Sequence, residues 1–146
     1  VARRLRLALA ETSTQGELAQ RLTGSTQGAA AFAGASILPH TQTLHDTLGL
    51  SAEVLKGGGF PSQEAADAAA QAVRRTYGVD LGLAIMGPVD PGAPDAPPVY
   101  FALATEDGRL LSGQPAQGRS GPSGRGWLIH LALDLVRRHL LGLPIR

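Results

Sequence analysis

Three consecutive hydroxyl side chains follow a carboxylate near the start of this chain, in the segment Ala10-Glu11-Thr12-Ser13-Thr14-Gln15-Gly16, here called the hydroxyl turn. A short apolar strand over residues 5–9 is predicted to lead into it, and a helix is predicted to begin near Glu17. Open α/β sheets bind their ligands at such strand-to-helix turns. These side chains could therefore supply a nucleophile with its orienting groups, or they could bind an anion at the helix N-terminus.

The same residue types also fit a purely structural role. Thr14-Gln15-Gly16-Glu17 has the spacing of a capping box. In that motif the Thr14 hydroxyl would accept a hydrogen bond from a free amide, and the Glu17 carboxylate would reach back to the start of the helix. On the residues alone, helix cap and functional site both stay open.

Length and charge limit the class of protein. The 146 residues are enough to bury the core of one domain, so we expect a single domain over residues 1–146. The 13 basic and 12 acidic residues give a formal net charge of +1, and the basic residues are spread over both halves of the chain. This distribution lacks the basic patch of a protein that binds nucleic acid or an anionic membrane, so neither is an expected partner.

Missing residue types and patterns exclude further classes. Because the chain has no cysteine, it can form neither disulfides, nor thiolate nucleophiles, nor zinc sites built on sulfur. We expect no metal and no cofactor. No apolar run is long enough to span a membrane, and the first residues lack the pattern of a signal peptide, so we expect a cytoplasmic protein.

Strand and helix patterns alternate along the chain around this turn. Gly24 is expected to end the first helix, and Gly34 indicates a strand that another backbone or a ligand approaches closely. The expected strands cover residues 5–9, 29–38, 81–86, 99–105 and 109–114, the expected helices cover 17–23, 41–48, 51–55, 61–77 and 125–141, and loops cover 25–28, 87–98 and 118–124. Helical crossovers give parallel neighbours, and a hairpin gives antiparallel ones. The predicted fold class is α/β, a three-layer α/β/α sandwich on a mixed, mostly parallel sheet.

Further motifs follow the hydroxyl turn in a characteristic order: Arg21-Leu22-Thr23, Phe32-Ala33-Gly34, Leu48-Gly49-Leu50, Gly82-Leu83-Ala84-Ile85 and Ala132-Leu133-Asp134-Leu135-Val136-Arg137-Arg138. With these motifs, almost the whole chain resembles the C-terminal domain of CinA, the competence/damage-inducible protein family. That domain also occurs alone as an amidohydrolase of nicotinamide mononucleotide (NMN). The resemblance implies the same sandwich fold and an enzyme that converts NMN to nicotinate mononucleotide and ammonia.

The resemblance also assigns roles within the hydroxyl turn. In the family this turn reads Ala-Glu-Ser-Cys-Thr-Gly-Gly, so the nucleophilic serine falls on Thr12 and the following cysteine falls on Ser13. Thr12 or Ser13 is therefore the implied catalytic nucleophile, although the threonine methyl group restricts χ1 and crowds attack. The implied substrate-binding residues are Thr14, Gly16, Gly34, Gly87 and Arg125, of which Arg125 would bind the phosphate.

Two family residues that activate the nucleophile are replaced. The family's Tyr-Ser-Asn-x-x-Lys segment aligns so that its tyrosine becomes Pro39 and its lysine becomes Leu44. Losing a general base of this kind costs roughly 10² to 10⁴ in rate. His40 or His45 could act as a substitute base, whereas Lys56, the only lysine, is expected to be a solvated surface residue.

The family's nucleotide-binding loop after the central strand is also changed. Met86 lacks the hydroxyl, Pro88 lacks an amide donor, and Asp90 places a negative charge where a phosphate is expected. All three changes disfavour an anionic nucleotide. The structural alternative is a rigid, proline-rich connection. One of the family's two arginines before the last helix is lost unless Arg119 replaces it.

Three functions stay open. The chain could be an active NMN amidohydrolase, with Thr12 or Ser13 as the nucleophile. It could instead be a catalytically degenerate member with a structural, oligomerisation or regulatory role. A third function is the hydrolysis of an uncharged amide, with His40 or His45 in place of the lysine. The combined losses favour the degenerate member.

Two expectations concern what the domain associates with. A small nucleotide or amide is the expected ligand, and the apolar last helix predicts a homo-oligomer. Family members carry a helix before the first strand, which leaves open a further N-terminal segment or domain before Val1.

Overall fold

The computed structural model describes residues 5–38, 41–57, 61–88, 90–119 and 121–145. Within these ranges, strands and helices follow the predicted order with one added helix. The strands are β1 (Leu7–Glu11), β2 (Phe32–Ile37), β3 (Leu81–Met86), β4 (Tyr100–Ala104) and β5 (Leu110–Ser112), and the helices are α1 (Glu17–Thr23), α2 (Thr26–Ala31), α3 (Thr41–Leu48), α4 (Ala52–Gly57), α5 (Gln63–Tyr77) and α6 (Gly121–Leu141).

The strands form one mixed sheet in the order β2-β1-β3-β4-β5. β1 pairs in parallel with both β2 and β3, while β4 is antiparallel to both β3 and β5. β5 therefore points in the same direction as the three parallel strands, which confirms the predicted sheet. The chain passes from β1 to β2 on one side and later returns to β3 on the other side of β1. Between the carboxyl ends of β1 and β3 the strand order thus reverses, and the hydroxyl turn lies there.

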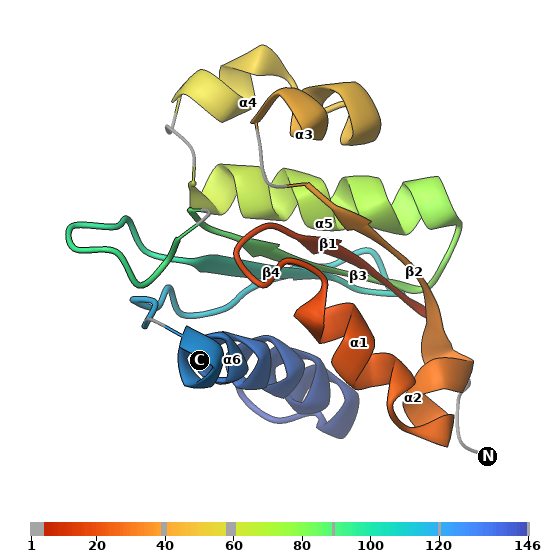
Figure 1. The fold of residues 1–146 in the computed structure, drawn as a ribbon. Helices are drawn as coiled ribbons and strands as arrows, with labels where there is room; N and C mark the ends of the chain where they lie inside the picture. The colour runs from red at the N-terminus through yellow and green to blue at the C-terminus, as the bar shows by residue number, and fades with distance from the viewer. Residues whose placement is uncertain (1–4, 39–40, 58–60, 89, 120, 146) are drawn as a thin grey trace.

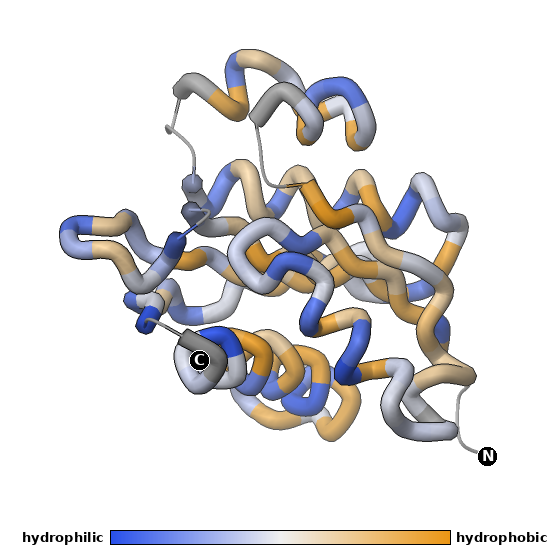
Figure 2. The backbone as a smooth tube through the Cα atoms, viewed as in Figure 1, coloured by the Kyte–Doolittle hydropathy of each residue, from blue (hydrophilic) through white to orange (hydrophobic). Residues whose placement is uncertain are grey.

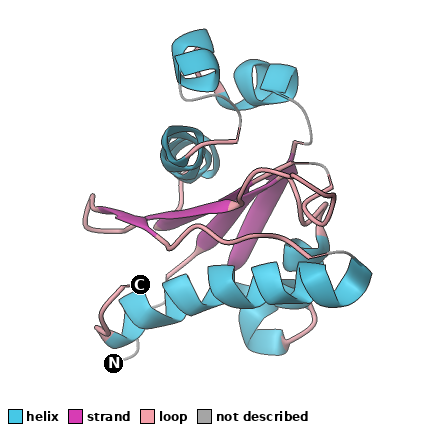
Figure 3. Ribbon diagram, turned by 90° about the vertical axis from the view of Figure 1, so that its left-hand side faces the viewer, coloured by secondary structure: helices cyan, strands magenta, loops and turns pink. Residues whose placement is uncertain are grey.

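Helices cover both faces of the sheet and confirm the predicted sandwich. α1, α2 and α6 lie on one face, and α5 lies on the other (Figures 1 and 3). α3 and α4 form an additional outer layer on α5. Hydrophobic positions gather along the strands and in α6, as Figure 2 shows. Each face of the sheet has its own buried apolar cluster, one formed with α5 and the other with α6.

α5 packs close to the sheet at Gly82, and its buried positions are mostly alanine. At Gly82 in β3, a Cβ atom would lie 2.1 Å from the carbonyl oxygen of Ala70. Only glycine permits this approach. The Ser62 hydroxyl caps the start of α5 by accepting a hydrogen bond from the Ala65 amide, and Gly78 ends the helix with φ 61°.

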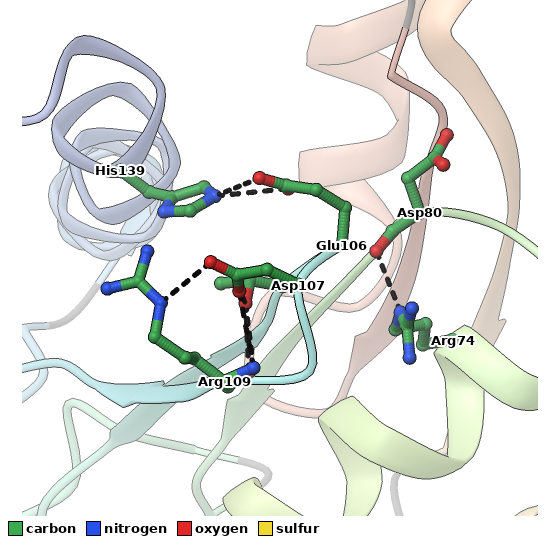
Figure 4. A network of polar contacts seen from close by, with 7 residues as sticks. Arg74, Asp80, Glu106, Asp107, Arg109 and His139 are labelled. Atoms are coloured by element: carbon green, nitrogen blue, oxygen red, sulfur yellow. Dashed lines mark hydrogen bonds and ion pairs between the residues drawn. The ribbon is translucent and has the colours of Figure 1, made fainter.

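Polar side chains hold the β4–β5 hairpin at the opposite end of the sheet from the hydroxyl turn (Figure 4). The Glu106 carboxylate lies 2.9 Å from His139 Nε2 and so connects the hairpin to α6. Within the hairpin, the Asp107 carboxylate accepts hydrogen bonds from the hydroxyl of Thr105 and from Nε of Arg109. These contacts lower the pKa of Asp107 to about 2, and the Thr105 hydroxyl has the largest effect.

Two expected loops are partly helical. Residues 25–28 were predicted as a loop, but α2 begins at Thr26, because the Ser25 hydroxyl accepts a hydrogen bond from the Gly28 amide at 3.0 Å. The following strand is correspondingly shorter than predicted. The loop predicted over residues 118–124 ends early, since α6 begins at Gly121 rather than near Arg125. Proline is tolerated in the first turn of a helix, where amides have no partner within the helix.

Candidate functional site

Thr12 lies at the junction of β1 and β3 and binds the backbone of the facing loop. Its hydroxyl oxygen lies 3.1 Å from the carbonyl oxygens of Ile85 and Gly87, and it accepts a hydrogen bond from the Gly87 amide at 2.8 Å. The Thr12 amide also donates to the Ile85 carbonyl at 3.1 Å. The residue is 1% exposed. The group that the family resemblance assigns as nucleophile thus holds two segments of backbone together.

Ser13 makes a second contact across the same junction. Its hydroxyl donates to the carbonyl of Pro88 at 2.6 Å, and the residue is fully buried. At Gly87, a Cβ atom would lie 2.3 Å from the Ser13 hydroxyl oxygen. Thr12 and Ser13 therefore both lie against Gly87, where the absence of a side chain leaves room for the Ser13 hydroxyl.

Glu11 organises the start of α1 from inside the protein. Its buried carboxylate accepts hydrogen bonds from the amides of Leu18 and Ala19, each at 3.1 Å, and from the Thr14 hydroxyl at 2.5 Å. A negative charge is favourable at this end of a helix, where backbone amides have no intrahelical partner. The position usually available to a bound anion is thus occupied by a carboxylate of the chain.

The predicted capping box is wrong in its details. The residue at the N-cap is Gly16, with φ 90°, which has no side chain to act as a cap. Thr14 donates to Glu11 instead of covering an amide, and Glu17 turns towards Arg125. The prediction failed because the capping carboxylate, that of Glu11, belongs to the preceding strand.

Arg125, the arginine expected on a phosphate, is engaged in an ion pair. Its Nε donates to a carboxylate oxygen of Glu17 at 2.8 Å, with side chains 37% and 29% exposed. This contact joins the first turn of α1 to α6. Arg119, the possible replacement for the family's other arginine, lies over the ring of Trp127, with its guanidinium carbon 5.1 Å from the ring centre.

The residues expected to activate the nucleophile do not surround the hydroxyl turn within the described chain. Leu44, which occupies the position of the family's lysine, is fully buried in the apolar cluster beside α5. His45 is exposed, and its Nδ1 lies 2.8 Å from the carbonyl oxygen of Leu50. Pro39 and His40 lie outside the described residues, as does the side chain of Lys56.

The three changed positions at the end of β3 and in the loop after it each make contacts within the chain. Met86 is fully buried in the cluster beside α5. Pro88 offers its carbonyl to Ser13, and the exposed Asp90 accepts a hydrogen bond from the Gly92 amide at 3.2 Å. Pro88 and Asp90 thus both make hydrogen bonds within the chain, and that of Pro88 joins the loop to the hydroxyl turn.

Gly34 lies in β2 and packs against α5, which the sequence did not indicate. A Cβ atom there would lie 2.4 Å from the ring of Tyr77 at the end of α5. The Tyr77 hydroxyl is also 3.3 Å from the Ser36 hydroxyl. The group that packs closely against this strand is therefore an aromatic side chain of the protein.

The described residues contain no group of three or more His, Cys, Asp or Glu side chains that could hold a metal ion.

Comparison with known proteins identifies the family. Residues 1–140 match the family model described as "CinA C-terminal domain". The chain belongs to this family. A CinA-like protein of Desulfovibrio desulfuricans is 36% identical to this CinA domain over 95% of the present chain. A CinA-like protein of Frankia casuarinae is 37% identical over 99% of the present chain. The domain spans 34% of each of these relatives.

Solved structures support the fold of the CinA domain. A competence-damaged protein (CinA) superfamily member from Klebsiella pneumoniae matches with a TM-score of 0.85, at 21% identity, over 94% of this chain and 88% of its own. The corresponding protein from Enterobacter cloacae matches with a TM-score of 0.83, at 22% identity, over 93% and 82%. Among the described helices, none is long and apolar enough to cross a membrane.

Proposed function

We propose that this CinA domain is a catalytically degenerate relative of the NMN amidohydrolases, with a structural, oligomerisation or regulatory role. The observation that carries the proposal is the environment of Thr12. A nucleophilic hydroxyl must transfer its proton to a base and approach a carbonyl carbon of the substrate. The Thr12 hydroxyl instead faces two carbonyl oxygens and an amide of the chain, at 1% exposure.

The burial of Leu44 supports the same proposal. Because this residue lies in the apolar core beside α5, the position aligned with the family's lysine supplies no charge to the hydroxyl turn. Arg125 forms an ion pair with Glu17. The amides at the start of α1 already donate hydrogen bonds to the Glu11 carboxylate. Proton transfer and phosphate binding would each have to displace an existing contact.

The test is hydrolysis of NMN by the purified domain at high protein concentration. Ammonia release is measured by a coupled assay and nicotinate mononucleotide by chromatography, with an active NMN amidohydrolase as the positive control. We expect no turnover above the uncatalysed background. Turnover by the wild-type chain that Thr12→Val or Ser13→Ala abolishes in a folded protein would overturn the proposal and establish an active amidohydrolase.

A short series of other amides separates the remaining alternative. If the domain hydrolyses an uncharged amide such as nicotinamide but not NMN, it is an enzyme with an altered substrate. Binding of NMN without turnover, measured by calorimetry, would indicate a degenerate domain that retains its ligand and would favour a regulatory role.

A further inference from the structure

A cavity lies between α6 and the β4–β5 side of the sheet, away from the hydroxyl turn. Its volume is about 520 Å³, and its walls include Phe101, Gln114, Trp127, Leu131 and Asp134. Cavities of roughly 300–1,000 Å³ are the usual size for sites that bind small molecules. None of the hydroxyl-turn residues lines this cavity, so it requires a separate explanation.

The apolar part of the wall is aromatic and partly exposed. Trp127 is the only tryptophan of the chain and is 37% exposed, although tryptophan side chains are usually well covered. Its ring stacks on His130, with ring centres 6.0 Å apart and planes inclined by 23°. Phe101 also lines the cavity, at 1% exposure. Aromatic side chains favour an aromatic ring as a ligand, which would share the Trp127 ring with His130 and with Arg119, whose guanidinium carbon lies 5.1 Å from the ring centre.

The polar part of the wall carries an excess of positive charge. Arg137 donates to one carboxylate oxygen of Asp134 from Nε and Nη2, at 3.2 and 3.0 Å, and Arg138 donates to the other oxygen from Nε at 2.8 Å. Both guanidinium groups thus bind the same carboxylate. They lower the pKa of Asp134, and the hydrogen bond from Arg138 has the largest effect. Because arginine stays protonated, one positive charge of the three groups is uncompensated.

From the combined shape, aromatic surface and charge, we propose that this α6 cavity binds a small planar aromatic anion. Its ring would lie beside Trp127 and Leu131, and its anionic group would face Arg137. The proposal is independent of the hydroxyl turn and holds whether or not the domain hydrolyses an amide.

Trp127 makes the proposal testable without labelling. Titration with benzoate, a planar aromatic anion, should give a saturable change in tryptophan fluorescence, and calorimetry should give the same affinity. The neutral benzamide, which carries an uncharged amide in place of the carboxylate, is the matched ligand and should bind more weakly. Leu131→Tyr, which fills the cavity without adding a second tryptophan, should remove the saturable response in a protein that unfolds cooperatively as the wild type does.

Charge variants test the second half of the proposal. Arg137→Gln should weaken binding of the anion by about twofold to fivefold, the effect typical of a partly exposed ion pair, and should leave binding of the neutral ligand unchanged. Arg75→Gln is the control, because Arg75 is exposed in α5 on the other face of the sheet. Absence of a saturable response, equal affinities for both ligands, or insensitivity to both Leu131→Tyr and Arg137→Gln would overturn the proposal.

Discussion

Thr12→Val removes the hydroxyl at the β1–β3 junction while keeping the branched shape of the side chain. A hydroxyl has one proton, so Thr12 donates one hydrogen bond, shared between the carbonyls of Ile85 and Gly87, and accepts one from the Gly87 amide. The variant loses both. It also leaves the Gly87 amide without this acceptor at a buried position, whereas the Ile85 carbonyl keeps the Thr12 amide as a partner.

The size of the effect follows from these two losses. A lost neutral hydrogen bond costs about 0.5–1.5 kcal/mol, and an unsatisfied buried donor costs about 1–3 kcal/mol. We therefore expect Thr12→Val to lower the free energy of unfolding by about 2–4 kcal/mol, a large part of the roughly 5–15 kcal/mol available to a domain. Urea denaturation monitored by circular dichroism measures this change, with an unchanged dependence on denaturant showing that the compactness of both states is preserved.

Thr23→Val is the matched control for this measurement. The Thr23 hydroxyl donates to helix carbonyls of Ala19 and Gln20 on an exposed surface, so the same chemical change should cost less than about 0.5 kcal/mol. A Thr12→Val protein as stable as the wild type would refute the argument, because the hydroxyl would then be energetically free for another role. Loss of amide hydrolysis in such a protein would identify Thr12 as a nucleophile.

Three further perturbations test other contacts. Glu11→Gln keeps the shape but removes the charge that caps α1, and should lower the free energy of unfolding by about 1–3 kcal/mol in thermal or urea melts. Thr105→Ala should move the pKa of Asp107 from about 2 towards its ordinary value of 3.8, which a carbon-13 NMR titration of the carboxyl group would detect. Because the pKa of Asp107 is depressed in the folded state, its contribution to stability is present above pH 3.8 and is lost as the pH falls towards 2. Gly82→Ala should destabilise by at least about 2 kcal/mol, since its Cβ would overlap the carbonyl of Ala70, and an unaltered melting curve would contradict that packing.

Elements with local signals could be predicted from the sequence. The apolar run Leu81–Met86 is β3 with the same bounds, and the end of α5 at Tyr77 is fixed by the following Gly78. The start of α6 was misplaced because the residue types of its first turn are also common in loops. α2 was missed because serine is common both in loops and at helix N-caps, and only the structure shows that the Ser25 hydroxyl caps a helix.

The sequence indicated a strand-to-helix turn at residues 10–16, but not its contacts. The structure places this turn where the strand order reverses between β1 and β3. The Thr12 and Ser13 hydroxyls bind backbone carbonyls 73 or 75 residues away, and a carbonyl has no signature in the sequence. The cap from Glu11 was missed for a similar reason, since its carboxylate reaches amides seven and eight residues ahead, beyond the spacing of known capping motifs.

The layering around α5 has a consequence for motions of the native state. This helix is covered by the sheet on one side and by α3 and α4 on the other, and its buried alanines share one apolar cluster with Leu44, Leu48 and Leu55. Opening α5 to water would therefore require the outer helices to detach as well as the sheet contacts to break. Its backbone amides should exchange with deuterium only through near-global unfolding, whereas α3 and α4 can open by a smaller fluctuation and exchange earlier.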